Sequence, residues 1–384
     1  MNETKESMFK ALIGDLFATR AQTLVNTVNC VGVMGKGVAL EFKKRYPGMY
    51  EDYVDRCNRR QVRLGEPYPY VDLSGASIVN FPTKDHWRSP SRYSDIESGL
   101  DYFVKHYRDW QIRSVAFPPL GCGNGGLEWA EVGPLMHAKL APLDIDVEVY
   151  APYGTPKTQL TLEFLTAPSQ MTLEGKGRKH QKMNPEWAAL MEVLRELGRQ
   201  PYANPVGRTI FQKICYVLTE LGVQTGFEFG KGSYGPFADE VKLALNDFAN
   251  RNWLQEERLG KMIALRAGSQ FEVDRPKLAD VLERHQRRIN KTVDLFSRIK
   301  DTEQAEEVMT ILYASRQLKG GDPEREIAEE QLYDYILEWK KAWRTDEKKQ
   351  AVASAIRHLV RLGWMRVRIS ESLPDLSEVA SLDD

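Results

Sequence analysis

The sequence lacks several features that mark particular classes of protein. It contains no run of about 18 apolar residues, so it predicts no membrane-spanning helix and no membrane partner. Its four cysteines include no C-x-x-C pair, which argues against a zinc site and against a disulfide framework. The polar start, MNETKESMFK, lacks the apolar stretch of a signal peptide. We therefore expect a cytoplasmic protein.

An excess of charge of either sign is also lacking. The 53 Lys and Arg residues nearly balance 54 Asp and Glu, so any contact with nucleic acid must be local. No group of carboxylates or histidines has the spacing of metal ligands, and we expect neither a metal nor a cofactor. With 384 residues, of which 42% are apolar, the chain is long enough for two or three domains with hydrophobic cores.

Residues 1–153 alternate short apolar strands with amphipathic helices. This alternation predicts an α/β domain in which helices flank a sheet. The predicted strands are residues 8–13, 23–27, 77–81, 114–118 and 147–152, and the predicted helices are residues 37–45, 50–60, 94–106 and 128–140.

The remaining chain has a different pattern. Residues 154–184 are polar and predict a linker with one short strand at 160–165, and residues 185–370 predict a mostly α-helical domain. The last residues, 371–384, carry five acidic and no basic side chains, which favours a solvated acidic tail. The predicted helices of the second half are residues 186–197, 207–221, 237–251, 277–298, 305–318, 324–343 and 348–362.

Two glycine-rich loops each follow a strand and precede a helix. They are NTVNCVGVMGKGV at 26–38 and PPLGCGNGGL at 118–127. Glycines let backbone N–H groups approach an anion, and a helix N-terminus adds partial positive charge. Two such loops at one sheet edge would hold a diphosphate, although a pair of ordinary tight turns would give the same pattern. The run at 121–126 satisfies G-x-G-x-x-G, but it lies in the last βα unit and not in the first, as a dinucleotide-binding fold requires.

Lys84 lies just past a predicted strand end, within NFPTKDHWR. An amine at this position could reach a ligand held by the two loops. To act as a nucleophile it must be neutral, and burial or the nearby cations Arg88 and Lys36 would lower its pKa. A solvated surface charge is the alternative that the residue alone would favour.

Four separated segments then resemble, in order and spacing, the signature motifs of macrodomains, which are ADP-ribose-binding α/β domains with a mixed sheet flanked by helices. They are MFKALIGDLF at 8–17, LVNTVNCVGVMGKGVA at 24–39, NFPTK at 80–84 and PLGCGNGG at 119–126. The subgroup they resemble is shared by terminal ADP-ribose glycohydrolases and DarG-type antitoxins. The resemblance covers residues 8–153, and the rest of the chain carries the mostly α-helical domain.

The resemblance implies a role for each motif. Asp15 would accept from the adenine amine with Leu16 beside it, the first glycine loop would surround the distal ribose and pyrophosphate, and the second loop would wrap the diphosphate. The full set of ADP-ribose-binding residues that it implies is Asp15, Leu16, Thr27, Val28, Asn29, Met34, Gly35, Lys36, Gly37, Val38, Thr83, Leu120, Gly121, Cys122, Gly123, Asn124, Gly125 and Gly126.

The resemblance also implies the reaction. Lys84 matches the catalytic lysine, which would attack the anomeric carbon of the distal ribose before water clears the adduct. The implied substrate is thymine-linked ADP-ribose on single-stranded DNA, placed there by a DarT-like toxin. Relatives that act on proteins carry an acidic residue in the second loop where this sequence has Gly125. The general acid is therefore unassigned, because Asp85 and His86 have only their position near Lys84 in their favour.

Trp87, Arg88 and Arg92 form a small aromatic and basic cluster beside Lys84. Bases stack on aromatic side chains and guanidinium groups bind phosphates, so we hypothesise that this cluster holds the DNA strand. The alternative is that Trp87 is a packed anchor and that both arginines are solvated.

The second half offers no catalytic set of residues. The segments at 211–222 and 233–241 resemble the C-terminal region of DarG-type antitoxins, which implies direct binding of a DarT-like toxin. Acidic clusters at 301–307 and 322–338 would complement a basic toxin surface, or they are solvated helix faces. A winged-helix reading needs a basic recognition helix, whereas residues 237–251 offer only Lys242 and Arg251.

Together these features predict an antitoxin that hydrolyses ADP-ribose from thymine in single-stranded DNA and binds its toxin through the C-terminal domain. One alternative is a macrodomain that binds ADP-ribose without cleaving it, joined to a protein-interaction module. Another is an antitoxin that protects through its second half alone.

Overall fold

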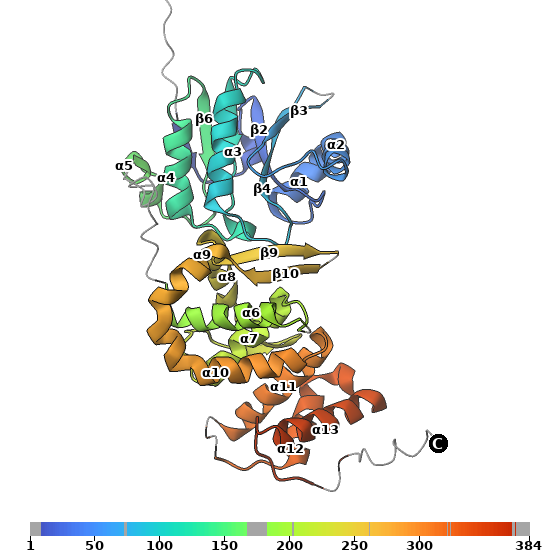
Figure 1. Ribbon diagram of the computed structural model, residues 1–384. Coiled ribbons are helices and arrows are strands. Elements are labelled where there is room, and N and C mark those ends of the chain that lie inside the picture. The colour runs from blue at the N-terminus through green and yellow to red at the C-terminus, as the bar shows by residue number, and fades with distance from the viewer. Residues whose placement is uncertain are drawn as a thin grey trace, which may run out of the picture. The chain divides into compact units, whose positions relative to one another are not determined.

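The computed structural model describes residues 9–72, 75–166, 183–201, 203–260, 262–320, 322, 324–370 and 373 (Figure 1). The chain forms two compact units. The first comprises residues 1–183 together with 242–251, and the second comprises residues 184–241 and 252–384. Each unit has its own arrangement of helices and strands.

A six-stranded sheet organises the first unit, in the order β1-β6-β5-β2-β4-β3. Every neighbouring pair is parallel except β3 and β4. The strands are β1 (Phe9–Leu12), β2 (Thr23–Asn29), β3 (Tyr68–Val71), β4 (Ser77–Lys84), β5 (Ser114–Phe117) and β6 (Asp146–Tyr150). The five strands predicted in this unit are confirmed. Strand β3 was not predicted, because Pro69 interrupts its pattern and proline is tolerated only at a sheet edge.

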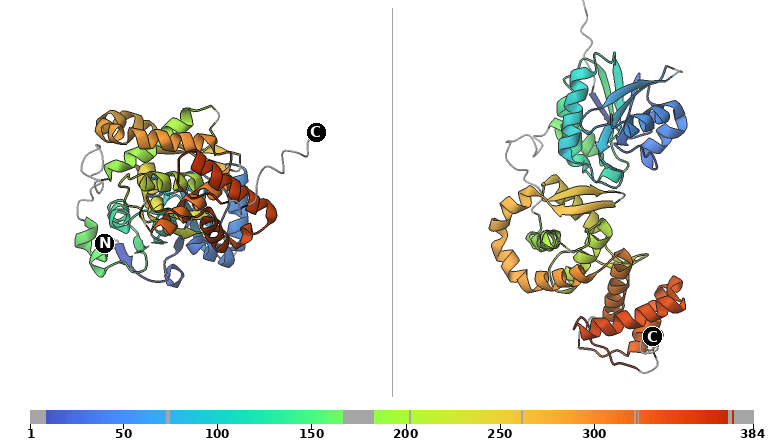
Figure 2. Two further views of the ribbon diagram at one scale, coloured as in Figure 1. Left: turned by 90° about the horizontal axis from the view of Figure 1, so that it is seen from below. Right: turned by 45° about the vertical axis from the view of Figure 1, so that its right-hand side comes forward.

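Helices cover both faces of this sheet (Figures 1 and 2). Both faces need cover because apolar side chains project from both. Neighbouring strand residues point to opposite faces, and Ile78 and Val79 accordingly lie in different cores. One core contains α3 and α4, and the other contains α1 and α2. The bounds are α1 (Gly37–Arg45), α2 (Pro47–Asn58), α3 (Tyr93–His106) and α4 (Trp129–Leu140), which confirms the four predicted helices to within a few residues.

The short strand predicted at 160–165 is wrong. A 3-10 turn occupies Lys157–Leu160 and α5 occupies Leu162–Thr166. Leu165 is 4% exposed, and Leu160 and Phe164 pack against the same core as α4. Leu160 and Phe164 are four positions apart, which is a helical spacing and places both side chains on the side that faces the core. The rest of the predicted linker, 167–182, lies outside the described residues.

The second unit is rich in helices, as predicted, but it also contains two β-hairpins that were not. The hairpins are β7 (Gly230–Gly232) with β8 (Gly235–Phe237), and β9 (Leu254–Leu259) with β10 (Met262–Ala267). The helices that follow residue 184 are α6 (Ala188–Arg199), α7 (Arg208–Glu220), α8 (Glu240–Asn250), α9 (Ser269–Asp274), α10 (Ala279–Arg298), α11 (Thr302–Lys319), α12 (Glu329–Trp339) and α13 (Asp346–Arg361). The helix predicted at 324–343 is shorter, because Ala328 pairs with Arg368 in a β-bridge.

The acidic clusters of the second half are largely paired within the unit. Glu306 lies 2.7 Å from Lys340, and Glu303 and Glu307 both pair with Lys348. Buried Glu329 pairs with Arg357 at 3.0 Å. These four carboxylates therefore stabilise the packing of α11, α12 and α13. Most acidic residues of the cluster at 322–338 are exposed, namely Asp322, Glu324, Glu326, Glu330, Asp334 and Glu338. Of the predicted acidic tail only Leu373 is described, and it is buried in the same core.

Within the described part of the chain, no helix is long and apolar enough to cross a membrane. The same residues hold no group of three or more His, Cys, Asp or Glu side chains placed to bind a metal ion.

Candidate active site at the sheet edge

Three adjacent parallel strands, β5, β2 and β4, end at one edge of the sheet. The first glycine loop (residues 26–38) begins in the last residues of β2, and the second glycine loop (residues 118–127) follows β5. Lys84 ends β4. A Cβ on Gly37 would lie 3.6 Å from Nδ2 of Asn124, so the end of the first loop reaches the second. In parallel sheets, ligands bind at this carboxyl edge.

The end of β4 departs from a regular strand. Val28 pairs with Pro82, but Asn29 pairs with Lys84, so Thr83 is an extra residue on β4. Such a bulge redirects the side chain that follows it. Here the Thr83 side chain is buried with its hydroxyl 3.5 Å from the Val28 carbonyl, and the Lys84 amine donates to the carbonyl of Asn124. The bulge thus accompanies a lysine that points at the second glycine loop.

Asn29 builds the first glycine loop from within. Its Nδ2 donates to the carbonyl of Val33 at 2.6 Å, and its Oδ1 accepts from the amide of Val31 at 3.0 Å. The Tyr53 hydroxyl lies 2.8 Å from the Asn29 carbonyl and 3.0 Å from its Oδ1. Both ends of the Asn29 amide are therefore engaged by the protein, and its predicted contribution to ADP-ribose binding would come through the shape of the loop.

Four other predicted binding residues are almost completely buried. Val28, Met34, Thr83 and Leu120 have side chains that are at most 4% exposed. Met34 and Val28 belong to the core below the first loop, and Leu120 belongs to the core below the second. At these positions the residues therefore fix the shape of the two loops by packing beneath them.

The second glycine loop has left-handed backbone at Gly121 (φ +72°), Gly123 (φ +69°) and Gly126 (φ +77°). Residues Gly123–Gly125 form a 3-10 turn, and the Gly126 amide donates to the Gly123 carbonyl at 3.0 Å. Glycine adopts such φ values without the strain that a side chain brings. The tight turn explains why this stretch of sequence is so rich in glycine.

Ser91 supports the second loop from below, and sequence analysis missed it. Its amide donates to the carbonyl of Gly125 at 3.0 Å, and its side chain is fully buried. A Cβ at Gly125 would lie 2.5 Å from the Ser91 hydroxyl and 3.8 Å from Cε of Lys84. Ser91 therefore fills the space that a carboxylate at position 125 would need. A serine in a loop gives no sequence signal for such a role.

We expect Gly125→Asp to weaken ADP-ribose binding at least tenfold, because the new Cβ must displace Ser91 and overpacking costs about 1–3 kcal/mol. The double variant Ser91→Gly/Gly125→Asp should recover most of the affinity, because it removes the obstructing hydroxyl and Cβ. Isothermal titration calorimetry with ADP-ribose measures both. Wild-type affinity in the single variant would show that the loop adapts without help from position 91.

Neither cysteine of the glycine loops is a nucleophile at neutral pH. Burial, with a contribution from Asp85, raises the pKa of the Cys30 thiol to about 12. Burial and Glu128 raise the pKa of Cys122 to about 12 as well. Because the thiolate is the reactive form of cysteine, a raised pKa keeps both thiols in the unreactive, protonated form.

Asp15 and Leu16 lie past the end of β1, two strands away from β5 in the sheet. At a strand spacing of about 4.8 Å this is about 10 Å from the second loop. Oδ1 of Asp15 accepts from the Phe17 amide at 2.9 Å, which fixes the carboxylate at the start of a 3-10 turn. The predicted adenine site is thus on the same sheet edge as Lys84 but at a separate position.

The predicted DNA-contact residues flank Lys84 along the chain. Trp87 is 47% exposed, and the Arg88 guanidinium lies 4.5 Å from the centre of its ring. Arg92 immediately precedes α3. Trp87 is therefore a surface side chain that stacks with Arg88, and not a core anchor.

The chain is similar to known proteins along much of its length. The macro domain family model matches residues 25–136. A DNA ADP-ribosyl glycohydrolase of Thermus aquaticus is 36% identical over 289 residues, which is 72% of this chain and 76% of the relative.

Two further similarities cover shorter stretches. A DNA ADP-ribosyl transferase-DNA ADP-ribosyl glycohydrolase fusion protein of Thermosipho africanus is 42% identical over 172 residues, which is 40% of this chain and 44% of the relative. The solved macrodomain of Mycobacterium tuberculosis DarG is 45% identical and covers 38% of this chain and 99% of that structure, with a TM-score of 0.37.

Proposed function

Because this chain belongs to the DNA ADP-ribosyl glycohydrolase family, we propose that it removes ADP-ribose from thymine bases of single-stranded DNA, with Lys84 as its nucleophile. The observation that carries the proposal is the Lys84 amine, which donates to the Asn124 carbonyl in the second glycine loop. The proposed nucleophile thereby contacts the proposed diphosphate-binding loop at Asn124. A ligand whose phosphates occupy the two loops would place its distal ribose next to this amine.

The proposed reaction has two steps. The neutral Lys84 amine attacks the anomeric carbon of the distal ribose, and the bond from that carbon to thymine N3 breaks with its electron pair going to N3. The proton lost by the new secondary amine balances the one that N3 takes up. Water then adds to the same carbon and the lysine leaves, which releases ADP-ribose and restores the amine.

Gly125 bears on which bond can be cleaved. With glycine at this position, the second loop supplies no carboxylate there to protonate a departing group. An imide nitrogen such as thymine N3 departs more readily than an alkoxide does, so the loop favours a base-linked substrate over a serine-linked one.

The DNA strand would run past Trp87. Its exposed indole offers a face on which a base can stack, and Arg88 and Arg92 supply positive charge for phosphates. All three residues follow Lys84 within one loop, so a strand held there would have its modified base close to the amine.

We further propose that the second unit binds a DarT-like transferase and thereby neutralises it. The Thermosipho africanus relative carries transferase and glycohydrolase activities in one chain, as its name states, and this supports a physical association of the two proteins.

We expect the wild-type protein to release ADP-ribose from an oligonucleotide that carries one ADP-ribosylated thymine. A peptide with serine-linked ADP-ribose should react at least a hundredfold more slowly, because the alkoxide is the poorer leaving group and Gly125 provides no acid. Chromatography of the released ADP-ribose measures both rates. A protein that binds ADP-ribose but releases none from either substrate would be a binding module without hydrolase activity.

A further inference from the structure

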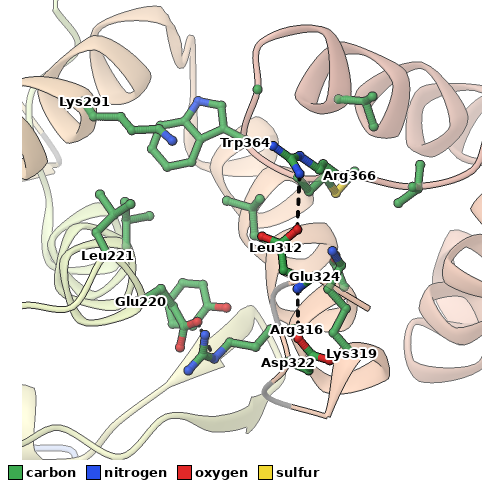
Figure 3. Close-up of a pocket in the computed structure, with 17 residues that line it drawn as sticks. Glu220, Leu221, Lys291, Leu312, Arg316, Lys319, Asp322, Glu324, Trp364 and Arg366 are labelled. Carbon is green, nitrogen blue, oxygen red and sulfur yellow. Dashed lines mark hydrogen bonds and ion pairs between the residues drawn. The ribbon is translucent and has the colours of Figure 1, made fainter. Parts of the chain in front are cut away.

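A cavity of about 630 Å³ lies in the second unit, between α7, α10, α11 and the segment that follows α13 (Figure 3). This volume is typical of a pocket for a small molecule or for a few protein side chains. No residue of the macrodomain motifs lines it. The cavity is thus a second candidate site with no part in the proposed hydrolysis.

The interior of the cavity is mainly apolar. Leu221 from the end of α7, Leu312 from α11 and Trp364 from the segment after α13 contribute to its walls. Tyr216 also contributes to the wall and is 1% exposed, with its hydroxyl buried inside the unit. The accessible part of the wall is therefore formed mainly by apolar groups.

Charged side chains surround this interior in pairs. Arg316 lies 2.6 Å from Glu220, and Arg366 lies 3.3 Å from Glu324. Figure 3 draws both pairs at the cavity, and Lys291 lies 4.3 Å from the centre of the Trp364 ring. A phosphate would have to compete with a carboxylate for each of these arginines, so the wall suits an apolar group better than a nucleotide.

We propose that this cavity receives an apolar or aromatic side chain from a peptide segment of the transferase partner. The inference rests on the proposed binding of the transferase by the second unit and names the place where the partner is held. Protein interfaces concentrate their affinity in a few side chains that fill such pockets, with paired charges at the rim that exclude water. The apolar walls and the paired rim of this cavity match that arrangement.

The test compares variants of the full chain for binding to a catalytically inactive form of the cognate transferase, by biolayer interferometry. Leu221→Glu places a charge in the cavity and should weaken binding at least a hundredfold.

Leu362→Glu is the matched control. Leu362 is 52% exposed, lies close to the cavity in sequence and does not line it. It should bind the transferase as wild type does. Both variants should keep the far-UV circular dichroism spectrum and the melting temperatures of the wild-type chain, which verifies that the second unit is folded.

The outcomes separate the two proposals. If the wild-type chain does not bind the transferase, the proposed function of the second unit fails. If it binds but Leu221→Glu binds equally well, only the cavity assignment fails.

Other results would identify a different mode of binding. Equal losses in Leu221→Glu and Leu362→Glu would assign binding of the transferase to a broad surface. A second ADP-ribose site in calorimetric titration of the wild type that Leu221→Glu lacks would instead identify a nucleotide site in the cavity. A wild-type dimer that Leu221→Glu dissociates would identify a second copy as the occupant.

Discussion

Lys84→Ala should lower the rate of ADP-ribose release from a thymine-ADP-ribosylated oligonucleotide by roughly a thousandfold or more, because losing a nucleophile removes the covalent step itself. Binding of ADP-ribose should change little, since the glycine loops and not the amine form the cradle for the phosphates. The amine of Lys84 donates to the Asn124 carbonyl, so its removal breaks one hydrogen bond of the second loop. Single-turnover release of ADP-ribose and calorimetric titration separate these two effects.

Lys84→Arg and Lys36→Ala are the controls for this result. Arginine retains the positive charge and donors but cannot act as a nucleophile, because it does not lose its proton. It should therefore be as inactive as alanine. Lys36, an exposed lysine just before α1 in the first loop, should affect affinity more than turnover. Substantial turnover by Lys84→Arg would exclude covalent catalysis and would leave a purely electrostatic role for the lysine.

Gly121→Ala should raise the dissociation constant of ADP-ribose at least a hundredfold. At φ +72° an added side chain costs about 1–2 kcal/mol in backbone strain. Its Cβ would also lie 2.6 Å from Cδ1 of Leu127 and 3.1 Å from Cβ of Ser91. These neighbours are buried, so the overpacking adds about 1–3 kcal/mol. The second loop should relieve both the strain and the overpacking by adopting another conformation, in which its backbone amides no longer point toward the ligand.

Gly123→Ala isolates the contribution of strain. Gly123 has φ +69°, close to that of Gly121, but a Cβ there would meet nothing within 4 Å. Its affinity loss should therefore be about fivefold to thirtyfold, the equivalent of about 1–2 kcal/mol. Calorimetric titration with ADP-ribose compares the two variants, and thermal melting shows whether either unfolds. Equal losses would mean that backbone conformation alone, and not packing against Leu127, sets the shape of the loop.

The sequence was sufficient for most of the first unit because its signals are local. Alternating apolar strands and helices place the two glycine loops and Lys84 at strand ends, and parallel strands bring those ends to one edge. The bulge at Thr83 depends on how β4 pairs with β2, which no stretch of sequence records by itself. The hydrogen bond from the Ser91 amide to the Gly125 carbonyl is likewise a contact between segments that are far apart in sequence.

The second unit was harder to predict for a different reason. Its hairpins are short, and β7 and β8 consist largely of glycine, proline and phenylalanine around a tight turn. The acidic clusters at 301–307 and 322–338 suggested an open charged face, but charge in a sequence does not show where the neutralising lysines and arginines come from. Lys348 and Arg357 reach these carboxylates from α13. The resemblance to macrodomains ends before this unit, so it offered no template for the cavity.

The packing of α5 sets a practical limit on how this protein can be dissected. The Trp129 indole donates to the Gln159 carbonyl at 3.3 Å, and a Cβ on Gly133 would lie 3.3 Å from Leu165. A fragment that stopped at Tyr153, where the resemblance to macrodomains ends, would expose this side of α4 to water and to proteases. A fragment that keeps this side covered must extend at least to Thr166. Because residues 242–251 also belong to the first unit, a cut after Thr166 divides the sequence in two but does not separate the two units cleanly.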